Sequence, residues 1–273
     1  MADYSKSLWK KIPFIKLLKY SLVGYAISFS TPFMRIGGEP LRAIMLKKEC
    51  GVDYKTGSSS LVIDRFIEFC GTILFGVVCL ILLVFFPINL YFKLILGFLV
   101  SFSSFLLFYF YYRSIKNKGS FSSLFVLFRL DKIRNWEKFT KILKDVENKV
   151  GYFFTNHKKE FFLSFLFYCM SGTFFILEFK YAFLIFGIDA NITEIILAVT
   201  LLGIANLTPI PGGLGVLEGL QSGLFHLMKG EGSIGLALVL LLRVRALLVI
   251  VFGYSLALHF GGVQFLKDYK KKQ

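Results

Sequence analysis

Long apolar segments recur along this chain and constrain its fold more than any other feature. A helix needs about 20 consecutive apolar residues to cross the hydrocarbon core of a bilayer. Hydrophobic residues make up 56% of the 273 residues, and the alternation typical of a membrane barrel strand is absent. The segments that meet this length are Ser58–Phe86, Leu90–Tyr112, Phe161–Gly187 and Ile234–Phe260. The sequence therefore predicts an all-α, polytopic membrane protein with four full spans, forming a single membrane domain over residues 1–273.

The net charge of +15 is concentrated between the apolar segments. Residues 1–19, 42–55 and 113–160 are rich in Lys and Arg, as is the C-terminus, whereas 86–91 is uncharged and 187–194 is acidic. Basic loops mark the cytoplasmic face, where they meet anionic lipid headgroups. We therefore expect a multi-pass protein of the cell membrane with both termini in the cytoplasm. Nucleic acid is not expected as a partner, because the positive charge belongs to the loops.

Two further apolar segments are interrupted by proline and glycine. The first contains "TPFMRIGGE" (31–39), and the second contains "TPIPGGLGVLE" (208–218) within the apolar run that starts at Ile195. Proline lacks a backbone donor and glycine favours non-helical backbone, so both interruptions break a helix. Broken backbone is tolerated at membrane depth only where protein buries it or where it lines a wet cavity. Together with the loop charges, this predicts two re-entrant helical hairpins that enter from opposite sides.

The two interruptions also resemble each other, since both read Thr-Pro, a short gap, Gly-Gly and then Glu. Opposed broken hairpins of related sequence are typical of an inverted repeat, whose half-helix ends meet near the midplane and form a substrate site. We predict a first half over 12–112, with a hairpin and two spans, and a second half over 161–260, with a span, a hairpin and a span. Residues 113–160 are predicted to be a cytoplasmic, basic, amphipathic linker.

Within that linker, residues 131–157 place apolar side chains such as Val146 and Val150 at helical spacing, with lysines such as Lys144 and Lys149 on the other faces. Two interpretations are open. The helix lies on the inner leaflet with its apolar face in the headgroup region, or it is a linker helix packed on the bundle.

Charged residues inside the spans need a reason, because each costs about 2.5–3.5 kcal/mol near the bilayer centre. Asp64 and Glu68 lie one turn apart in the first span, and Arg65 lies three residues before Glu68. Either these groups belong to a site, or Arg65 and Glu68 form an ion pair within the helix that neutralises itself.

Arg243 lies near mid-depth of the last span, and Arg245 points about 200° away from it. We expect Arg243 to lie within pairing distance of Glu218 or of the first hairpin tip, because an unpaired guanidinium there is too costly. Guanidinium groups and free N–H groups at helix N-termini suit phosphate. The candidate substrate-binding residues are Arg35, Gly37, Gly38, Glu39, Arg42, Asp64, Arg65, Pro209, Pro211, Gly212, Gly213, Gly215, Glu218 and Arg243. The alternative is structural pairing, for example of Glu218 with an arginine, that locks the fold.

No set of residues points to catalysis. The three histidines are scattered singly, the four cysteines form no CxxC pair, and the glycine-rich stretch lacks the lysine of a phosphate-binding P-loop. We therefore expect no catalytic residue, no metal ion and no cofactor, and a chain that is not an enzyme.

Four stretches in order, "TPFMRIGGEPLRAIMLKKECG", "SLVIDRFIEF", "NLTPIPGGLGVLEG" and "LLLRVRALL", resemble the lysylphosphatidylglycerol synthase membrane-domain family. The resemblance runs over roughly residues 12–260, and Pro-x-Pro-Gly-Gly-Leu-Gly-x-x-Glu is its most specific part. It implies a flippase-type membrane domain that moves a lipid between leaflets, or assists in moving it. That lipid is an aminoacylated phosphatidylglycerol in the best-known members.

The chain departs from this family in three ways. Asp64 stands where the family usually has Glu, and "MADYSKSLWKK" does not supply the spanning helix that usually precedes the first hairpin. The sequence to Gln273 has no room for a soluble aminoacyltransferase domain, so we expect that the chain is not a synthase by itself.

Three functions are compatible with these features. The first is a flippase or transporter-like protein that moves a phosphate-bearing lipid between leaflets, the lipid being an anionic or aminoacylated phospholipid or a polyprenyl phosphate. The second is a non-transporting membrane partner that presents a lipid-linked substrate to a separate lipid-modifying enzyme, and association with itself is a further possible partnership. The third is a membrane-embedded transferase with Glu218 or Glu39 as base.

Overall fold

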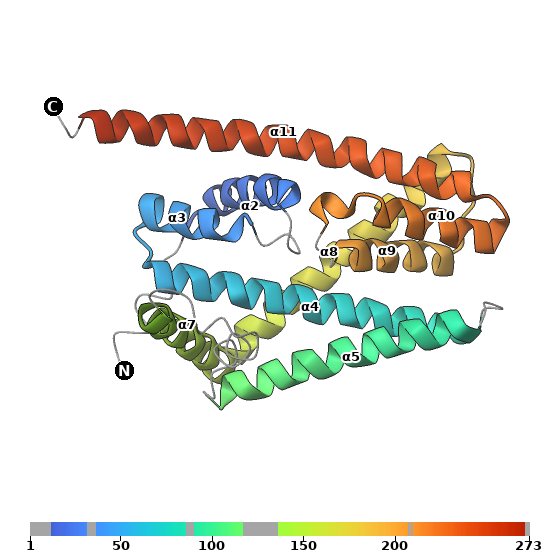
Figure 1. The fold of residues 1–273 in the computed structure, drawn as a ribbon, viewed down its shortest axis with the longest axis horizontal. Coiled ribbons are helices and arrows are strands. Elements are labelled where there is room, and N and C mark those ends of the chain that lie inside the picture. The colour runs from blue at the N-terminus through green and yellow to red at the C-terminus, as the bar shows by residue number, and fades with distance from the viewer. Residues whose placement is uncertain are drawn as a thin grey trace. The chain divides into compact units, whose positions relative to one another are not determined.

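The computed structural model describes residues 12–31, 37–85, 90–116, 136–206, 208 and 210–270, and these are helical almost throughout (Figure 1). The helices are α2 (Phe14–Ser30), α3 (Glu39–Cys50), α4 (Tyr54–Val84), α5 (Leu90–Ile115), α7 (Trp136–Asn156), α8 (Lys158–Ile185), α9 (Ile192–Asn206), the single 3₁₀ turn η2 (Pro211–Gly213), α10 (Val216–Lys229) and α11 (Gly232–Lys270). No strand occurs among these described residues, and the predicted all-α fold is confirmed.

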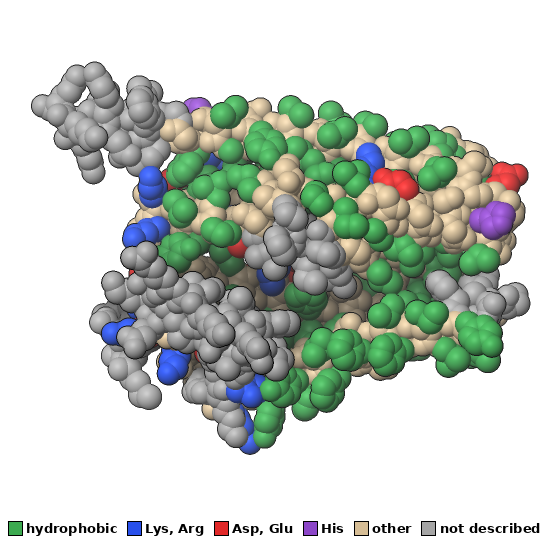
Figure 2. Space-filling view, in the orientation of Figure 1, with side chains coloured by type: hydrophobic (Ala, Val, Ile, Leu, Met, Phe, Trp, Pro, Cys, Tyr) green, Lys and Arg blue, Asp and Glu red, His purple; other side chains and the backbone are tan. Residues whose placement is uncertain are grey.

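Within the described part of the chain, four helices are long and apolar enough to cross a membrane. These stretches are Tyr54–Val84, Lys93–Ile115, Lys158–Ile185 and Gly232–Gly261. Large hydrophobic side chains such as Phe98 on α5 and Leu248 on α11 are exposed, and such side chains cover the visible flanks of both helices in Figure 2. A hydrophobic surface of this extent is what a chain presents to lipid rather than to water. The predicted multi-pass membrane protein is therefore confirmed, while the side on which each terminus lies stays a prediction.

Two pairs of shorter helices flank the interrupted segments. α2 and α3 have 17 and 12 residues, and α9 and α10 have 15 and 14. At 1.5 Å per residue the longest of them extends about 26 Å, which is less than the roughly 30 Å of a hydrocarbon core. Each pair thus has the length expected of a re-entrant hairpin, and its position in a bilayer stays a prediction.

The ends of α3 follow from local sequence. Gly38 is the N-cap, Glu39 and Pro40 occupy the first turn, and Gly51 ends the helix in the left-handed conformation with φ of 64°. An acidic residue and a proline favour a helix start, and a left-handed glycine favours a helix end. The glycine and proline residues that interrupt the apolar segment therefore also begin its second helix.

Contacts divide the chain into two compact units that do not follow chain order. One unit comprises residues 1–54 and 201–273, and the other comprises residues 55–200. In the first unit, α11 packs against both α2 and α10, and α2 packs against α3. Figure 1 shows α2 and α10 lying along successive stretches of α11. Residues from both interrupted segments consequently belong to one compact unit, although about 170 positions separate them in the sequence.

Glycines allow α11 to approach both helix pairs closely. A Cβ atom at Gly253 would lie 2.5 Å from the carbonyl oxygen of Leu22 in α2, and one at Gly235 would lie 2.2 Å from that of Gln221 in α10. Such contacts require glycine, because a Cβ would meet backbone that cannot move aside. Small residues at helix interfaces are the usual basis of tight helix packing in membranes.

In the second unit, α7 packs on α4. The shared core comprises Ile63, Phe66 and Ile67 of α4 and Val146, Val150 and Phe154 of α7. The described part of the linker therefore supports the interpretation of a helix packed on the bundle, while residues 131–135 lie outside the described residues. Lys149 departs from the predicted pattern. The helical spacing of apolar residues in this segment placed Lys149 on an outward face, but it is 7% exposed and donates a hydrogen bond to Thr56 Oγ1.

Candidate functional site

The turn between α9 and α10 has an irregular backbone that only glycine adopts readily. Gly212, Gly213 and Gly215 have φ values of 58°, 62° and 78°. A side chain with a Cβ is disfavoured at each of these angles. The turn leaves the helical hydrogen-bond pattern, so its carbonyl groups need other partners when they are removed from water.

Arg243 of α11 supplies those partners. Its Nη1 donates to the carbonyl oxygen of Gly212 at 2.5 Å, and its Nη2 donates to that of Gly213 at 3.3 Å. The same guanidinium donates to Glu218 Oε1 from Nε at 3.1 Å and from Nη2 at 2.9 Å. One side chain therefore joins the last span to the broken turn and to the helix that follows it. The predicted pairing of Arg243 with Glu218 is confirmed.

Glu218 also stabilises the start of α10. Its Oε2 accepts a hydrogen bond at 2.7 Å from the backbone N–H of Gly215, the N-cap residue. This is the reciprocal contact of a capping box, and a carboxylate in the first turn also opposes the helix dipole. The side chains of Arg243 and Glu218 are 16% and 31% exposed. The pair is thus largely withdrawn from the surface, with each carboxylate oxygen bound by a different partner.

Phe29, near the end of α2, contacts the same turn. The Cζ atom of Arg243 lies 6.0 Å from the centre of the Phe29 ring. A Cβ atom at Gly212 would lie 2.8 Å from that ring, so the aromatic side chain lies directly against the glycine. Phe29 is not among the predicted site residues. Its position two residues before the "TP" of the first interruption does not by itself distinguish it from the other phenylalanines.

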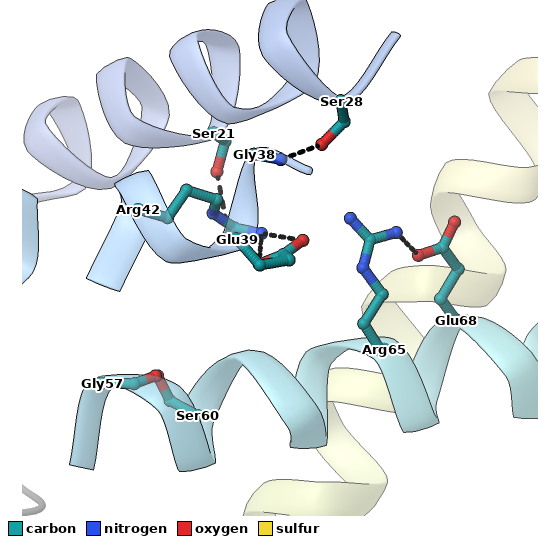
Figure 3. A network of polar contacts seen from close by, with 9 residues as sticks. All are labelled: Ser21, Ser28, Gly38, Glu39, Arg42, Gly57, Ser60, Arg65 and Glu68. Carbon is teal, nitrogen blue, oxygen red and sulfur yellow. Dashed lines mark hydrogen bonds and ion pairs between the residues drawn. The ribbon is translucent and has the colours of Figure 1, made fainter. Parts of the chain in front are cut away.

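The first helix pair has its own ion pair (Figure 3). Arg42 Nη1 donates to both carboxylate oxygens of Glu39, at 3.2 and 3.3 Å, and Nη2 donates to Ser21 Oγ at 3.5 Å. The backbone N–H of Gly38 donates to Ser28 Oγ at 2.9 Å. Glu39 and Arg42 lie three residues apart on α3, so this pair is local, whereas the pair of Arg243 and Glu218 joins two helices.

Glycines bring α2 and α3 together around that pair. A Cβ at Gly38 would lie 2.0 Å from the carbonyl oxygen of Gly24, and one at Gly24 would lie 2.5 Å from Cδ of Arg42. Gly37 lies against Thr31, whose Oγ1 would be 1.9 Å from an added Cβ. The predicted residues Gly37 and Gly38 therefore serve the close approach of the two helices.

Asp64 and Arg65 belong to the other unit. Arg65 Nη1 contacts Glu68 Oε2 at 2.5 Å within α4, which is the ion pair that one interpretation of this segment predicted (Figure 3). Asp64 is exposed. Both residues belong to the unit of residues 55–200, and their part in a lipid site stays a prediction.

The remaining predicted positions divide into two groups. Pro211, Gly212, Gly213 and Gly215 form the turn itself, in which Gly212 and Gly213 are buried. Arg35 and Pro209 lie outside the described residues. Among the residues that the structure describes, no three His, Cys, Asp or Glu side chains come together to hold a metal ion.

The turn brings together groups that can bind an anion. A guanidinium that holds a carboxylate through two nitrogens presents the same fork to a phosphate. The start of α10 adds the positive end of a helix dipole beside it. These groups are therefore chemically suited to hold a carboxylate or a phosphate.

The amino-acid sequence and the structure were compared with those of known proteins. No curated protein and no solved structure matches the chain. A family model described as "Lysylphosphatidylglycerol synthase TM region" matches residues 4–253. These include both helix pairs, the first three spanning stretches, most of the fourth, and the contact of Arg243 with Glu218. The resemblance of the four sequence stretches is thereby confirmed, and the chain belongs to the lysylphosphatidylglycerol synthase TM region family.

Proposed function

We propose that this protein moves a phosphate-bearing lipid between the leaflets of the cell membrane, with both termini in the cytoplasm. Membership of a family named for the membrane region of a lipid synthase supports a role with membrane lipids. The observation that carries the proposal is the contact of Arg243 with Glu218 and with the carbonyl groups of the glycine turn. It combines a positive charge, irregular backbone and the start of a helix in one place.

The proposed binding step is an exchange of anions on Arg243. In this structure Nε, Nη1 and Nη2 of the guanidinium all donate hydrogen bonds. A lipid phosphate displaces the Glu218 carboxylate, while the two turn carbonyls stay bound. Glu218 keeps its second contact with the N–H of Gly215. No step leaves an uncompensated guanidinium in a low-dielectric region, which would cost several kcal/mol.

We further propose that the chain catalyses no covalent step and requires no cofactor. The groups gathered at the turn are an arginine, a glutamate that caps a helix, and backbone amides. These groups suit the binding and release of an anion, and among the described residues of the turn no nucleophile stands beside a base. Lipid then moves down its own gradient, with its acyl or prenyl tails remaining in the bilayer.

A second candidate is a non-transporting partner that presents a lipid-linked substrate to a separate enzyme, acting alone or with a second copy of itself. The observation that favours it is the satisfied state of the Arg243 contact, because a fixed structural joint has the same hydrogen bonds. The two proposals differ in whether the protein alone accelerates lipid exchange.

The decisive experiment is reconstitution in liposomes with fluorescent lipids. Phosphatidylglycerol, lysyl-phosphatidylglycerol and a polyprenyl phosphate are tested separately, and protein-free liposomes give the background exchange rate of each lipid. We expect faster leaflet exchange for at least one lipid that carries a net phosphate charge or an aminoacylated headgroup. Arg243→Gln should abolish the acceleration. Arg245→Gln, on the same helix but about 200° away, should retain it.

Two results would contradict the transport proposal. If no lipid exchanges faster than in protein-free liposomes, the presenting partner becomes the better function. If Arg243→Gln and Arg245→Gln lose activity equally, and in step with the loss of folded protein, the Arg243 contact is a structural joint.

A further inference from the structure

We propose that Phe29 is a positioning residue that couples the first helix pair to the glycine turn of the second and orients Arg243 for anion exchange. The inference rests on the proposed function only for its transport measurement. The coupling itself concerns the fold of one compact unit and is testable without any lipid substrate.

The first step is the geometry of the ring. Phe29 lies beneath the guanidinium of Arg243, with 6.0 Å between Cζ and the ring centre. It also lies against Gly212, where an added Cβ would come within 2.8 Å of it. Gly212 and Arg243, the two groups that define the candidate site, therefore contact one side chain that precedes them by about 180 and about 210 residues in the sequence.

The second step is the anchoring of that side chain. Phe29 packs on a cluster formed by Ala26 of α2 and by Ala246 and Ile250 of α11. The next residue, Ser30, accepts a hydrogen bond at 2.9 Å from the hydroxyl of Tyr254 in α11. The end of α2 is consequently fixed to the same helix that carries Arg243, so the ring and the guanidinium hold a defined relation.

The third step connects the end of α2 to the first interruption. Ser28 accepts the N–H of Gly38, the residue that begins α3, and Thr31 Oγ1 donates to the carbonyl oxygen of Ser28 at 3.2 Å. A displacement of α3 relative to α2 therefore acts on the backbone next to Phe29. The ring transmits it to Gly212 and Arg243, because it contacts both.

The contact between Phe29 and Arg243 is compatible with a site in which one anion replaces another on the guanidinium. A guanidinium is planar, and its N–H groups point outward in that plane. The guanidinium carbon lies over the Phe29 ring while the nitrogens of Arg243 bind Glu218 and the turn carbonyl of Gly212, so the ring and these acceptors are accommodated together. An exchange of Glu218 for a phosphate then leaves the contact with Phe29 in place. A leucine would fill similar space without the negative face of an aromatic ring.

Amide hydrogen exchange of the purified protein in detergent tests the coupling. We compare wild type with Phe29→Leu, Phe29→Met and Phe29→Tyr, following the segment 210–215 and using α4 in the other unit as internal reference. We expect Leu and Met to raise exchange in 210–215 about tenfold, within the range of a desolvated cation–π contact. Tyr keeps the aromatic face and should stay within about twofold of wild type. Phe102→Leu, at an exposed position of α5, controls for the general effect of losing a phenylalanine.

Each outcome decides the proposal. Faster exchange with Leu and Met but not Tyr supports the coupling. Unchanged exchange with Leu, or equal acceleration by Leu, Met and Tyr, overturns it, because the ring then acts by bulk or not at all. Phe29→Met provides a second non-aromatic side chain if Phe29→Leu does not fold, and failure of Met and Tyr to fold as well would likewise show a purely structural residue.

Lipid exchange in the same variants separates this inference from the proposed function. Phe29→Leu should slow exchange of the transported lipid several-fold, and Phe29→Tyr should restore it. If wild type moves no lipid but the amide pattern is as expected, the coupling stands and the transport proposal fails. If wild type moves lipid and the amide pattern does not change, transport stands and the coupling fails.

Discussion

Replacing the two partners of the Arg243–Glu218 contact, singly and together, tests whether they form one energetic unit. Arg243→Gln removes the donors of two turn carbonyls and leaves the Glu218 carboxylate without its cation. Breaking a buried ion pair from one side costs about 3–5 kcal/mol. Glu218 is 31% exposed, so water recovers part of that loss, and we expect about 2–3 kcal/mol for this variant.

Glu218→Gln is a milder change. The glutamine oxygen still accepts a hydrogen bond, and Arg243 keeps the carbonyl groups of Gly212 and Gly213. The variant loses only the extra strength that the negative charge of Glu218 gives to its hydrogen bonds with Arg243, and we expect the free energy of unfolding to fall by about 1–2 kcal/mol. In the double variant no charge is left without its partner, so the total loss should be smaller than the sum of the single losses by roughly 1–2 kcal/mol.

Thermal unfolding of the three variants in one detergent, followed by intrinsic fluorescence, measures these differences. One kcal/mol corresponds to about 2–4 °C in a chain of 150–250 residues, so Arg243→Gln should lower the apparent midpoint by roughly 5–10 °C. The non-additivity of the double variant is the informative quantity. Strictly additive shifts would refute the reasoning, because they would mean that the two side chains stabilise the fold independently.

Three further predictions concern the backbone and the topology. Gly212→Ala should destabilise the protein by at least about 1–2 kcal/mol in thermal unfolding and lower lipid exchange, because φ is 58° there and a Cβ meets an aromatic ring. The matched control is Gly219→Ala, at an exposed interior position of α10 where an added Cβ meets no atom within 4 Å. Its thermal unfolding should be unchanged or slightly more stable than that of wild type. Gly253→Val should separate α11 from α2 and cause loss of folded protein in membranes, and a normal yield would argue against the backbone contact. Single cysteines at Asn191 and Asn156, in a background without the native cysteines, should react with a membrane-impermeant reagent from opposite sides; labelling from the same side would contradict the predicted topology.

The class of fold follows from the amino-acid sequence alone, because the length of an apolar segment is a local property. An apolar stretch of the length around Phe66 or Leu248 has one way to satisfy its backbone in lipid, which is a helix. The same reasoning predicted a partner for Arg243, since a guanidinium at mid-depth is too costly to leave alone. It could propose Glu218 because few carboxylates are available near the membrane interior.

The choice between alternatives for charged groups depended on tertiary contacts. Spacing allowed Arg65 to bind Glu68, and the structure shows this local pair, whereas a part of Arg65 in a lipid site stays a prediction. Spacing also placed Lys149 on an outward face, because helical periodicity describes only one helix at a time. The neighbouring α4 covers that face and supplies Thr56 as its acceptor.

Only the tertiary structure could identify Phe29 and the carbonyl groups that Arg243 binds. In a chain with 33 phenylalanines, nothing in the sequence distinguishes the one that contacts a guanidinium. The turn carbonyls of Gly212 and Gly213 become acceptors because positive φ angles turn them out of the helical pattern toward α11. These contacts join α2, the turn and α11, which lie far apart in the sequence. Contacts between distant segments depend on how the helices pack and not on any local pattern of residues.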